Sequence, residues 1–255
     1  MELERSALRS TPLYSLERLR GRAENAPFEA FLLRLPKARV RLSLAASSGP
    51  PKKLSSYIAA GGAFAGINGG FFSPDMRPLD WMIIDGSVVR AFSNPKRPCI
   101  YLDDGAARIG PPAGPETAPR GSVLQAGPLL LLEGVIQRDY ADFVERAADF
   151  DSDITAARHP RSVFGLEEGH YCFLAVLGRT FASRGLFLHE AAGLALAVGM
   201  RDAVNLDGGA SSTMIVEGRR LTKPRLNLIA PWWFLCPPLP GGEQKIPNAI
   251  LAHAR

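Results

Sequence analysis

The sequence predicts an α+β fold: a single domain with a mainly antiparallel or mixed sheet, many hairpins and one or two buried helices. Short apolar stretches recur at close intervals, and several are joined by an acidic residue followed by glycine, a turn typical of β-hairpins. Only two segments have helical composition, so the regular alternation of strand and helix found in parallel sheets is absent. Hydrophobic residues make up 46% of the 255 positions, enough to bury a sizeable core.

The chain begins with a charged segment, residues 1–25, which we expect to be an N-terminal extension of a domain that spans residues 26–255. Apolar and polar side chains alternate within residues 28–45, which indicates a strand with one face on the core. Residues 53–62 predict a short helix ended by two glycines, and residues 63–68 predict the next strand.

Four hairpins are expected where an acidic residue and a glycine separate two apolar runs. They span residues 81–90, 99–110, 127–137 and 161–178. The proline-rich residues 111–120 predict a loop. We place this loop inside the domain, because similar hairpins lie on both sides of it.

The second helix is predicted at residues 185–200, which are rich in Ala and Leu and apolar on nearly every side, so we expect it to be buried. Three further strands are predicted at residues 202–207, 213–221 and 246–254. Residues 138–160 are polar and acidic and indicate a loop or a partial helix. Residues 230–242 form an irregular apolar segment.

The charge balance argues against nucleic-acid binding. The net charge is +5 and the pI is about 9.3. The basic residues are scattered, without the run of five or six that marks a nucleic-acid-binding tail. A mildly basic surface also suits anionic sugar phosphates or polymers.

The chain ends and the cysteines restrict the class of protein further. Residues 1–21 lack the apolar centre of a secretory signal, and no stretch of about 20 uncharged apolar residues predicts a membrane span. Cys99, Cys172 and Cys236 are too far apart in sequence to form a close-spaced zinc or redox pair. We prefer three buried thiols to the alternative of one disulfide with one free thiol.

Two stretches repeat one arrangement, in which an apolar strand leads to an asparagine and then to two glycines. They are "FAGINGGFF" at residues 64–72 and "AVNLDGGASSTM" at residues 203–214. Glycine is favoured where the backbone needs a positive φ or where another group approaches closely. A single such pair is usually only a tight turn, but the repetition suggests two halves of one site.

The second stretch has the richer chemistry. Asn205 and Asp207 lie two apart, on the same side of the predicted strand. Ser211, Ser212 and Thr213 follow, and backbone N–H groups in such turns bind anions. Asp207 suits an acid, a base, a nucleophile or a metal ligand. Its structural alternative is to cap the turn.

The ordered motifs resemble the phosphodiester glycosidase family. They are "GINGGFF" (66–72), "AGPLLLLEG" (126–134), "RHPRSVFGL" (158–166), "LGR" (177–179) and "AVNLDGGASSTM" (203–214). The resemblance covers most of the chain and implies an α+β fold. It also implies a hydrolase that cleaves the glycosidic bond of a sugar 1-phosphodiester, such as an N-acetylglucosamine-1-phosphate diester or a cell-surface glycopolymer. Because the family is mostly extracytoplasmic, the resemblance favours a periplasmic or secreted protein, whereas the lack of a signal in residues 1–21 leaves a cytoplasmic protein as the alternative.

Carried over position by position, the resemblance implies a set of site residues. The catalytic set is Asp207, Arg161 and Asn68, and the substrate-binding set is Gly69, Gly70, Arg179, Asn205, Gly208, Gly209, Ser211 and Ser212. An arginine offers a planar fork for a phosphodiester anion, and a carboxylate stabilises an oxocarbenium-like transition state. We expect the glycine N–H groups to add donors, Asn68 to point at the ligand, and the phosphate leaving group to need no strong general acid.

Each weaker candidate also has a structural interpretation. Arg161 and Arg179 suit surface ion pairs, and Glu190 on the buried helix suits a pair with an arginine. Phe71 and Phe72 suit the core better than a sugar platform. His159 is a weak candidate, because a lone histidine in a loop is usually solvated.

The chain departs from the family pattern at several places. Leu177 stands where the family often has an acidic residue before "GR", and near the C-terminal end Asn227 and Asn248-Ala249 are kept. Two further departures concern the second glycine turn and an inserted segment. Ala210 replaces the third glycine after "NLD", and the aromatic segment 230–242, with Trp232 and Trp233, has no counterpart in the pattern. Both bear on the substrate more than on the fold, and they leave room for a non-catalytic member.

Two other functions remain compatible with these residues. The first is a carbohydrate- or polymer-binding module that does not cut. The second is a metal-dependent phosphodiesterase, which would need a carboxylate or histidine cluster around Asp207, where the only other candidates, such as Asp80, are distant in sequence. We expect no cofactor and no metal, with a divalent cation at Asp207 left open. The expected partner is a glycan or sugar-phosphodiester substrate, and the sequence does not set the oligomeric state.

Overall fold

The computed structural model describes residues 1–103, 106–114, 121–138, 157–222 and 243–255. Several predicted features lie outside these residues. They are the turn at 104–105, most of the segments 111–120 and 138–160, the aromatic segment 230–242, and Cys236.

The largest sheet has eight strands and carries much of the candidate site. Its order is β1 (Glu2–Ser10), β2 (Ser15–Ala23), β3 (Ala26–Pro36), β15 (His170–Val176), β14 (Arg161–Glu167), β16 (Asp202–Asn205), β12 (Leu129–Leu132) and β13 (Val135–Ile136). All of its paired strands are antiparallel.

Two five-stranded sheets and one two-stranded sheet complete the fold, again with antiparallel pairs. The second sheet runs β10 (Ala106–Gly110), β9 (Cys99–Asp103), β11 (Ser122–Gln125), β7 (Met82–Ile84) and β8 (Ser87–Arg90). The third runs β18 (Arg219–Arg220), β17 (Met214–Val216), β6 (Ala65–Asn68), β20 (Asn248–Ala254) and β4 (Val40–Ala46). The short sheet pairs β19 (Lys245–Ile246) with β5 (Lys52–Lys53).

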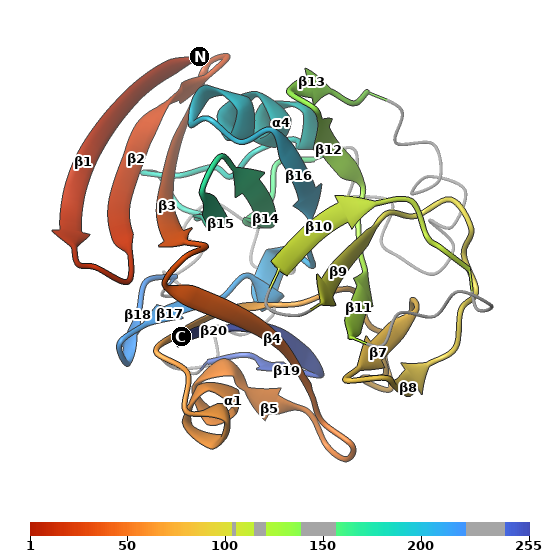
Figure 1. Ribbon diagram of the computed structural model, residues 1–255. Helices are drawn as coiled ribbons and strands as arrows, with labels where there is room; N and C mark the ends of the chain where they lie inside the picture. Colours follow the sequence, from red (N-terminus) through yellow and green to blue (C-terminus); the bar gives the residue numbers. More distant parts are fainter. Residues whose placement is uncertain (104–105, 115–120, 139–156, 223–242) are drawn as a thin grey trace.

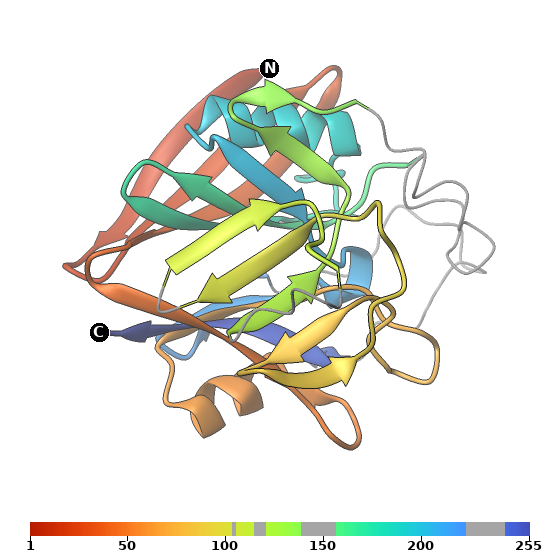
Figure 2. The same ribbon diagram turned by 45° about the vertical axis from the view of Figure 1, so that its right-hand side comes forward.

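The large sheet is apolar on both faces, because alternate side chains of its strands enter two different cores. Phe31, Leu33 and Leu35 of β3 join the core shared with the two smaller five-stranded sheets. Ala30 and Leu32 point to the opposite side and pack against helix α4 (Leu188–Ala197). The large sheet therefore separates α4 from the two smaller sheets (Figures 1 and 2).

The two predicted helices are confirmed. Helix α1 (Leu54–Gly61) packs Leu54 and Tyr57 against the third sheet. Gly62 ends it in a left-handed conformation with φ of 63°. Helix α4 is largely buried, as the apolar segment 185–200 predicts. No helix in the described residues is long and apolar enough to span a bilayer.

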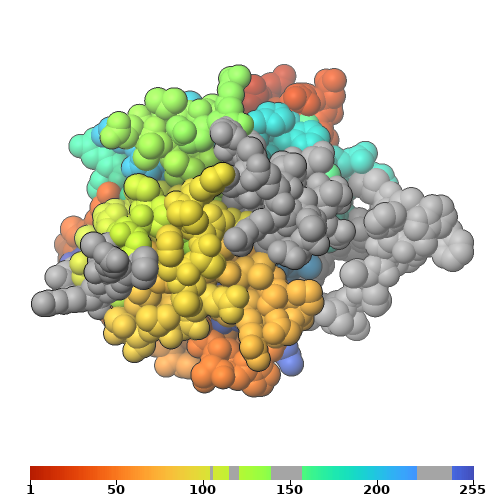
Figure 3. Space-filling model, turned by 90° about the vertical axis from the view of Figure 1, so that its right-hand side faces the viewer, coloured from red at the N-terminus to blue at the C-terminus, as the bar shows by residue number. Residues whose placement is uncertain are grey.

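The hairpins follow the predicted turns, and the mainly antiparallel fold class is confirmed. Asp85 and Gly86 between β7 and β8 have φ of 47° and 78°, and Glu133 and Gly134 between β12 and β13 have 51° and 81°. Such left-handed pairs match the twist of an antiparallel ribbon. The first of these turns joins two strands of the second sheet, and the other joins two strands of the large sheet. The part of the chain that forms the second sheet occupies the middle of the face shown in Figure 3 (yellow to yellow-green).

The sequence did not indicate every strand. Residues 2–10 and 15–23, within the segment predicted to be an extension, form β1 and β2 and continue the large sheet from β3. Strand β11 was not predicted either, and it lies between β9 and β7. Cys99 and Cys172 are free and buried, as expected.

Candidate active site

The two glycine turns meet at the junction of the large sheet and the third sheet. Strand β6 of the third sheet ends at Asn68, and β16 of the large sheet ends at Asn205. The backbone N–H of Asp207 donates to the carbonyl of Gly69 at 3.0 Å. The two motifs, about 140 residues apart in sequence, are therefore in direct contact.

The Asn68 side chain links three segments at this junction. Its Nδ2 donates to the backbone carbonyl of Asp207 at 2.8 Å. Its Oδ1 accepts from Ser162 Oγ at 2.6 Å and from the Thr213 N–H at 3.0 Å. Asn68 is 1% exposed, so its amide needs protein partners. The sequence led us to expect that this amide points at a ligand, whereas in the structure it supports the turn that carries Asp207.

Gly69 is required by Asn248 of β20, and both glycines of the first pair donate to that residue. The Gly69 N–H donates to the Asn248 carbonyl at 3.1 Å, and the Gly70 N–H donates to Asn248 Oδ1 at 2.8 Å. A Cβ atom on Gly69 would lie 1.9 Å from Asn248 Oδ1. Neither glycine has a positive φ. Gly69 therefore permits a close approach by β20, and a Cβ atom on Gly70 would instead lie 3.1 Å from the carbonyl of Gln125 in β11.

The second glycine pair shapes the turn after Asp207. Gly208 donates its N–H to Asp207 Oδ1 at 2.9 Å, and Gly209, with φ of 61°, donates to the Pro160 carbonyl at 2.9 Å. A Cβ atom on Gly208 would lie 2.9 Å from that same carbonyl. We expected the four glycine N–H groups to serve a substrate anion; in the structure all four donate to protein oxygens.

Asp207 is a half-buried carboxyl whose charged form is disfavoured. Burial raises its pKa to about 7, and the hydrogen bonds from Ser211 and from the Gly208 N–H oppose that rise. A carboxyl with such a pKa is present in both protonation states near neutral pH. It can then give or take a proton during a reaction.

The strand register places Arg161 opposite Asp207. Strands β14 and β16 pair Val163 with Asn205, and the Leu206 N–H extends the ladder to the Ser162 carbonyl at 2.8 Å. Continued by two residues past the end of β16, this register brings the backbone of Arg161 across from that of Asp207.

The Arg161 guanidinium is held by backbone carbonyls. Its Nε donates to Leu186 O at 3.0 Å and its Nη2 donates to Ala157 O at 3.1 Å. The side chain is 1% exposed. Its Cδ lies 4.0 Å from the position of a Cβ atom on Gly208. A buried cation beside the Asp207 turn favours an anion at this site.

Arg179 approaches the site from the loop after β15. Its Nη2 lies 3.5 Å from the position of a Cβ atom on Gly209, and the residue is exposed. Its φ of 60° is unusual for a residue with a side chain. The conformation is supported by hydrogen bonds between Thr180 and Ser183 and from Ser183 Oγ to the Leu177 carbonyl. Strain of this kind is common at functional sites.

Buried polar atoms surround the two turns. Asn205 donates through Nδ2 to Gly127 O at 3.2 Å and to Leu206 O at 2.7 Å. Within the described part of the chain, three buried side-chain atoms near the turns have no hydrogen-bond partner: Asn205 Oδ1, Ser212 Oγ and Asn248 Nδ2. Such atoms are costly in a folded protein unless water or a ligand satisfies them.

A sequence model of the phosphodiester glycosidase family matches residues 61–252, about three quarters of the chain. The chain belongs to the phosphodiester glycosidase family. No curated protein sequence matches it.

Solved structures of other proteins have the same fold as this chain. The catalytic domain of zebrafish N-acetylglucosamine-1-phosphodiester alpha-N-acetylglucosaminidase, auto-inhibited by its pro-peptide, superposes with a TM-score of 0.73 at 18% identity. That match covers 100% of this chain and 89% of the zebrafish chain. A hypothetical protein from Synechocystis matches with a TM-score of 0.65 at 14% identity, over 99% of this chain and 64% of that one.

The structure also shows the contacts of the weaker site candidates in this glycosidase-family chain. Glu190 forms an ion pair with Arg158, which is the structural alternative given above. Asp80 forms an ion pair with the buried Arg97. His159 forms a backbone bridge with Leu186. Phe71 is buried, as expected.

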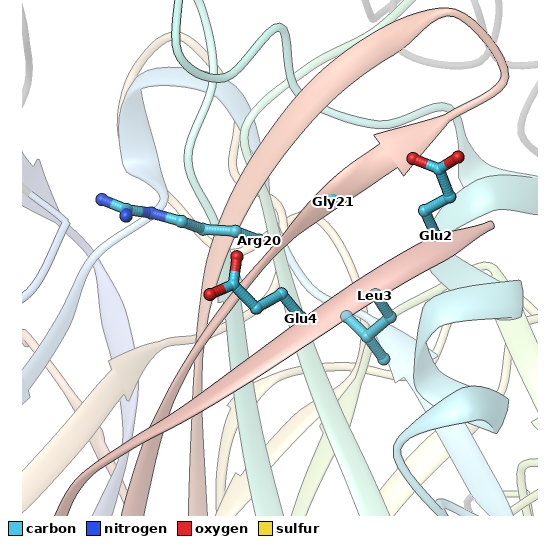
Figure 4. Close-up of a pocket in the computed structure, with 5 residues that line it drawn as sticks. All are labelled: Glu2, Leu3, Glu4, Arg20 and Gly21. Atoms are coloured by element: carbon cyan, nitrogen blue, oxygen red, sulfur yellow. The ribbon is translucent and has the colours of Figure 1, made fainter.

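One group of potential metal ligands and one surface hollow lie apart from these turns. In the described ranges, three such residues with ligand atoms within 4.8 Å of one another are Glu24, His189 and Glu190, and Glu190 is already paired with Arg158. A hollow on the β1–β2 hairpin is lined by Glu2, Leu3, Glu4, Arg20 and Gly21 (Figure 4). It contains none of the predicted site residues.

Sequence reasoning missed Ser162 and the contact role of Asn248. Ser162 follows Arg161 in β14, so it points to the opposite face, where it reaches Asn68. Strand alternation could have placed Ser162 on that face. The contact between Asn248 and Gly69 depends on the pairing of β6 with β20, which the sequence did not reveal.

We predict that Gly69→Ala destabilises the protein through Asn248. The new Cβ would overlap Asn248 Oδ1, so the free energy of unfolding should fall by roughly 1–3 kcal/mol in urea denaturation. Gly49→Ala is the control, because nothing lies within 4 Å of its Cβ position. Adding Asn248→Ala should cost less than the sum of the single changes. Strictly additive costs would show that Asn248 does not impose the glycine.

We also predict a stability change with pH that depends on Asp207. Its pKa is 3.8 in the reference state and about 7 when folded, so the folded state binds the extra proton between those values. The contribution of Asp207 to stability is therefore full below about pH 4 and is lost as the pH rises through about 7. Urea denaturation from about pH 5 to about pH 8 should show that the parent loses stability relative to Asp207→Asn. Parallel curves would contradict the raised pKa.

Proposed function

We propose that this protein hydrolyses the glycosidic bond of a sugar 1-phosphodiester. In this reaction the bond between the anomeric carbon and the phosphate oxygen breaks, and water supplies the new sugar hydroxyl and one proton. The products are the free sugar and a phosphate monoester. The observation that carries the proposal is the half-buried Asp207, with a pKa near 7, in a turn beside the buried Arg161, whose Cδ lies 4.0 Å from the Cβ position of Gly208.

The arginines suit the anionic part of such a substrate. Arg161 is buried beside the Asp207 turn, and the exposed Arg179 extends towards Gly209. A guanidinium can donate two parallel hydrogen bonds to a phosphodiester. This positive charge also stabilises the monoester that leaves, because negative charge grows on the phosphate as the bond breaks.

Asp207 suits the sugar part. As the leaving group departs, positive charge develops at the anomeric carbon, and a nearby carboxylate stabilises it. A pKa near 7 also lets the carboxyl accept a proton from the attacking water. Asn68 positions this group, since its Nδ2 holds the Asp207 carbonyl. The name of the zebrafish protein supports a sugar 1-phosphodiester as the substrate class.

The test is release of free sugar from a panel of sugar 1-phosphodiesters by the parent and by Asp207→Asn. We expect release by the parent and a loss of about 10²–10⁴-fold in the variant, because its amide can neither accept a proton nor supply a charge. Asp202→Asn is the matched control at the other end of β16, where Asp202 Oδ1 accepts the Glu133 N–H at 2.8 Å. That control should retain activity.

Two results would contradict the proposal. One is the absence of sugar release by the parent, together with equal binding of a diester by the parent and Asp207→Asn, which would indicate a binding module. The other is equal loss of activity in Asp207→Asn and Asp202→Asn, which would indicate a general effect on the fold.

A further inference from the structure

A buried ion pair lies next to the segment that carries Arg161. Arg158 donates through Nη1 to Glu190 Oε2 at 2.6 Å, and its Nη2 contacts the other carboxylate oxygen. The Glu190 side chain is 4% exposed and that of Arg158 is 17% exposed. The Arg158 guanidinium also covers the ring of Phe187 at 4.7 Å. The pair is thus largely shielded from water. An ion pair in such surroundings depends most strongly on its geometry.

The same carboxylate organises the start of α4. Glu190 Oε2 accepts the Phe187 N–H at 2.9 Å, one of the N–H groups that the first turn of a helix leaves unsatisfied. Arg158 also donates to the carbonyl of Ala23 at the end of β2, at 3.2 Å. The pair therefore connects the chain before β14, the start of α4 and the end of β2.

Backbone contacts extend this connection to the active site. His159 and Leu186 exchange hydrogen bonds of 3.2 and 3.0 Å. The Leu186 carbonyl then accepts Arg161 Nε at 3.0 Å, and the Pro160 carbonyl accepts the Gly209 N–H at 2.9 Å. Residues 158–161 thus fix both the Arg161 guanidinium and the turn after Asp207.

We propose that Arg158 and Glu190 are positioning residues, which hold residues 158–161 against residues 185–190 so that Arg161 is oriented towards the substrate phosphate. We call this arrangement the Arg158–Glu190 clamp. It rests on the proposed function, since it assigns Arg161 to a phosphodiester. The clamp acts through Arg161 and Gly209, and neither of its own side chains needs to touch the substrate.

If the ion pair only stabilised the fold, the double variant would behave differently from what the clamp predicts. Replacing both members of a buried pair by apolar residues often restores the stability that a single replacement removes, because no lone charge is left. Apolar residues at positions 158 and 190 would not restore the orientation of the Arg161 guanidinium. The double variant Arg158→Met/Glu190→Met therefore separates stability from positioning.

The experiment compares the full-length parent with Arg158→Met, with the double variant and with Arg34→Met. Arg34 is a matched control, because it contacts Glu167 Oε2 at 2.7 Å and Val198 O at 2.6 Å at the opposite end of α4. Its side chain is 11% exposed. Three quantities are measured: the free energy of unfolding in urea, amide hydrogen exchange, and kcat and KM for sugar release.

The clamp predicts a local effect in the exchange data. Both Arg158 variants should exchange the amides of His159, Leu186 and Gly209 at least about tenfold faster, while Arg34→Met should leave these three unchanged. Sugar release by both Arg158 variants should show kcat/KM lowered by about 10- to 100-fold. The double variant should regain stability and not kcat/KM.

Each contrary outcome has a definite meaning. Unchanged exchange at those three amides, or recovery of kcat/KM together with stability in the double variant, would overturn the clamp. A parent that releases no sugar and binds a diester as Asp207→Asn does would refute the proposed function, and exchange would then decide the clamp by itself. In that case, accelerated exchange at the three amides supports it and unchanged exchange overturns it.

Discussion

The buried side-chain amide of Asn68 is the contact on which the site depends. It lies where the third sheet meets the large sheet, and it holds the Asp207 carbonyl, the Ser162 hydroxyl and the Thr213 N–H. A buried amide with unsatisfied groups costs about 1–3 kcal/mol for each of them. Hydrogen bonds are directional, so those of Asn68 select one orientation of the two sheets, whereas apolar contacts alone would allow several. That orientation fixes the position of the Asp207 backbone.

Around Asn68, the glycine turns contribute close backbone packing, whereas Asp207 and Arg161 contribute ionisable side chains. Asn248 and the Pro160 carbonyl approach the glycine turns so closely that side chains there would collide with them. The turns are therefore closely packed, and the N–H groups of their four glycines donate to protein oxygens. We therefore assign the proposed chemistry to side chains. Burial raises the pKa of Asp207 to about 7, and the Arg161 guanidinium is buried beside the turn that follows it. A carboxyl and a cation so arranged suit a substrate that is anionic on one side and becomes cationic on the other.

Much of this could be predicted from the sequence, since the signals were local. The Asp85-Gly86 turn and the apolar composition of α4 indicated antiparallel hairpins and a buried helix, and both are present. The two glycine motifs were correctly expected to meet. What the sequence could not show depends on pairing between distant strands. The contact of Asn248 with Gly69 and the inward direction of the Asn68 amide follow from the registers of β6, β14 and β20. Strand β1 carries too little apolar side-chain area to indicate that it joins the sheet.

We propose that the bond cleaved by this protein lies between the anomeric carbon and the phosphate oxygen. The most direct measurement is hydrolysis of a sugar 1-phosphodiester in ¹⁸O-labelled water, followed by mass analysis of both products. We predict the label in the sugar hydroxyl and none in the phosphate monoester, because attack by water at the anomeric carbon leaves the water oxygen on the sugar. Label in the phosphate would show attack at phosphorus and would contradict the account.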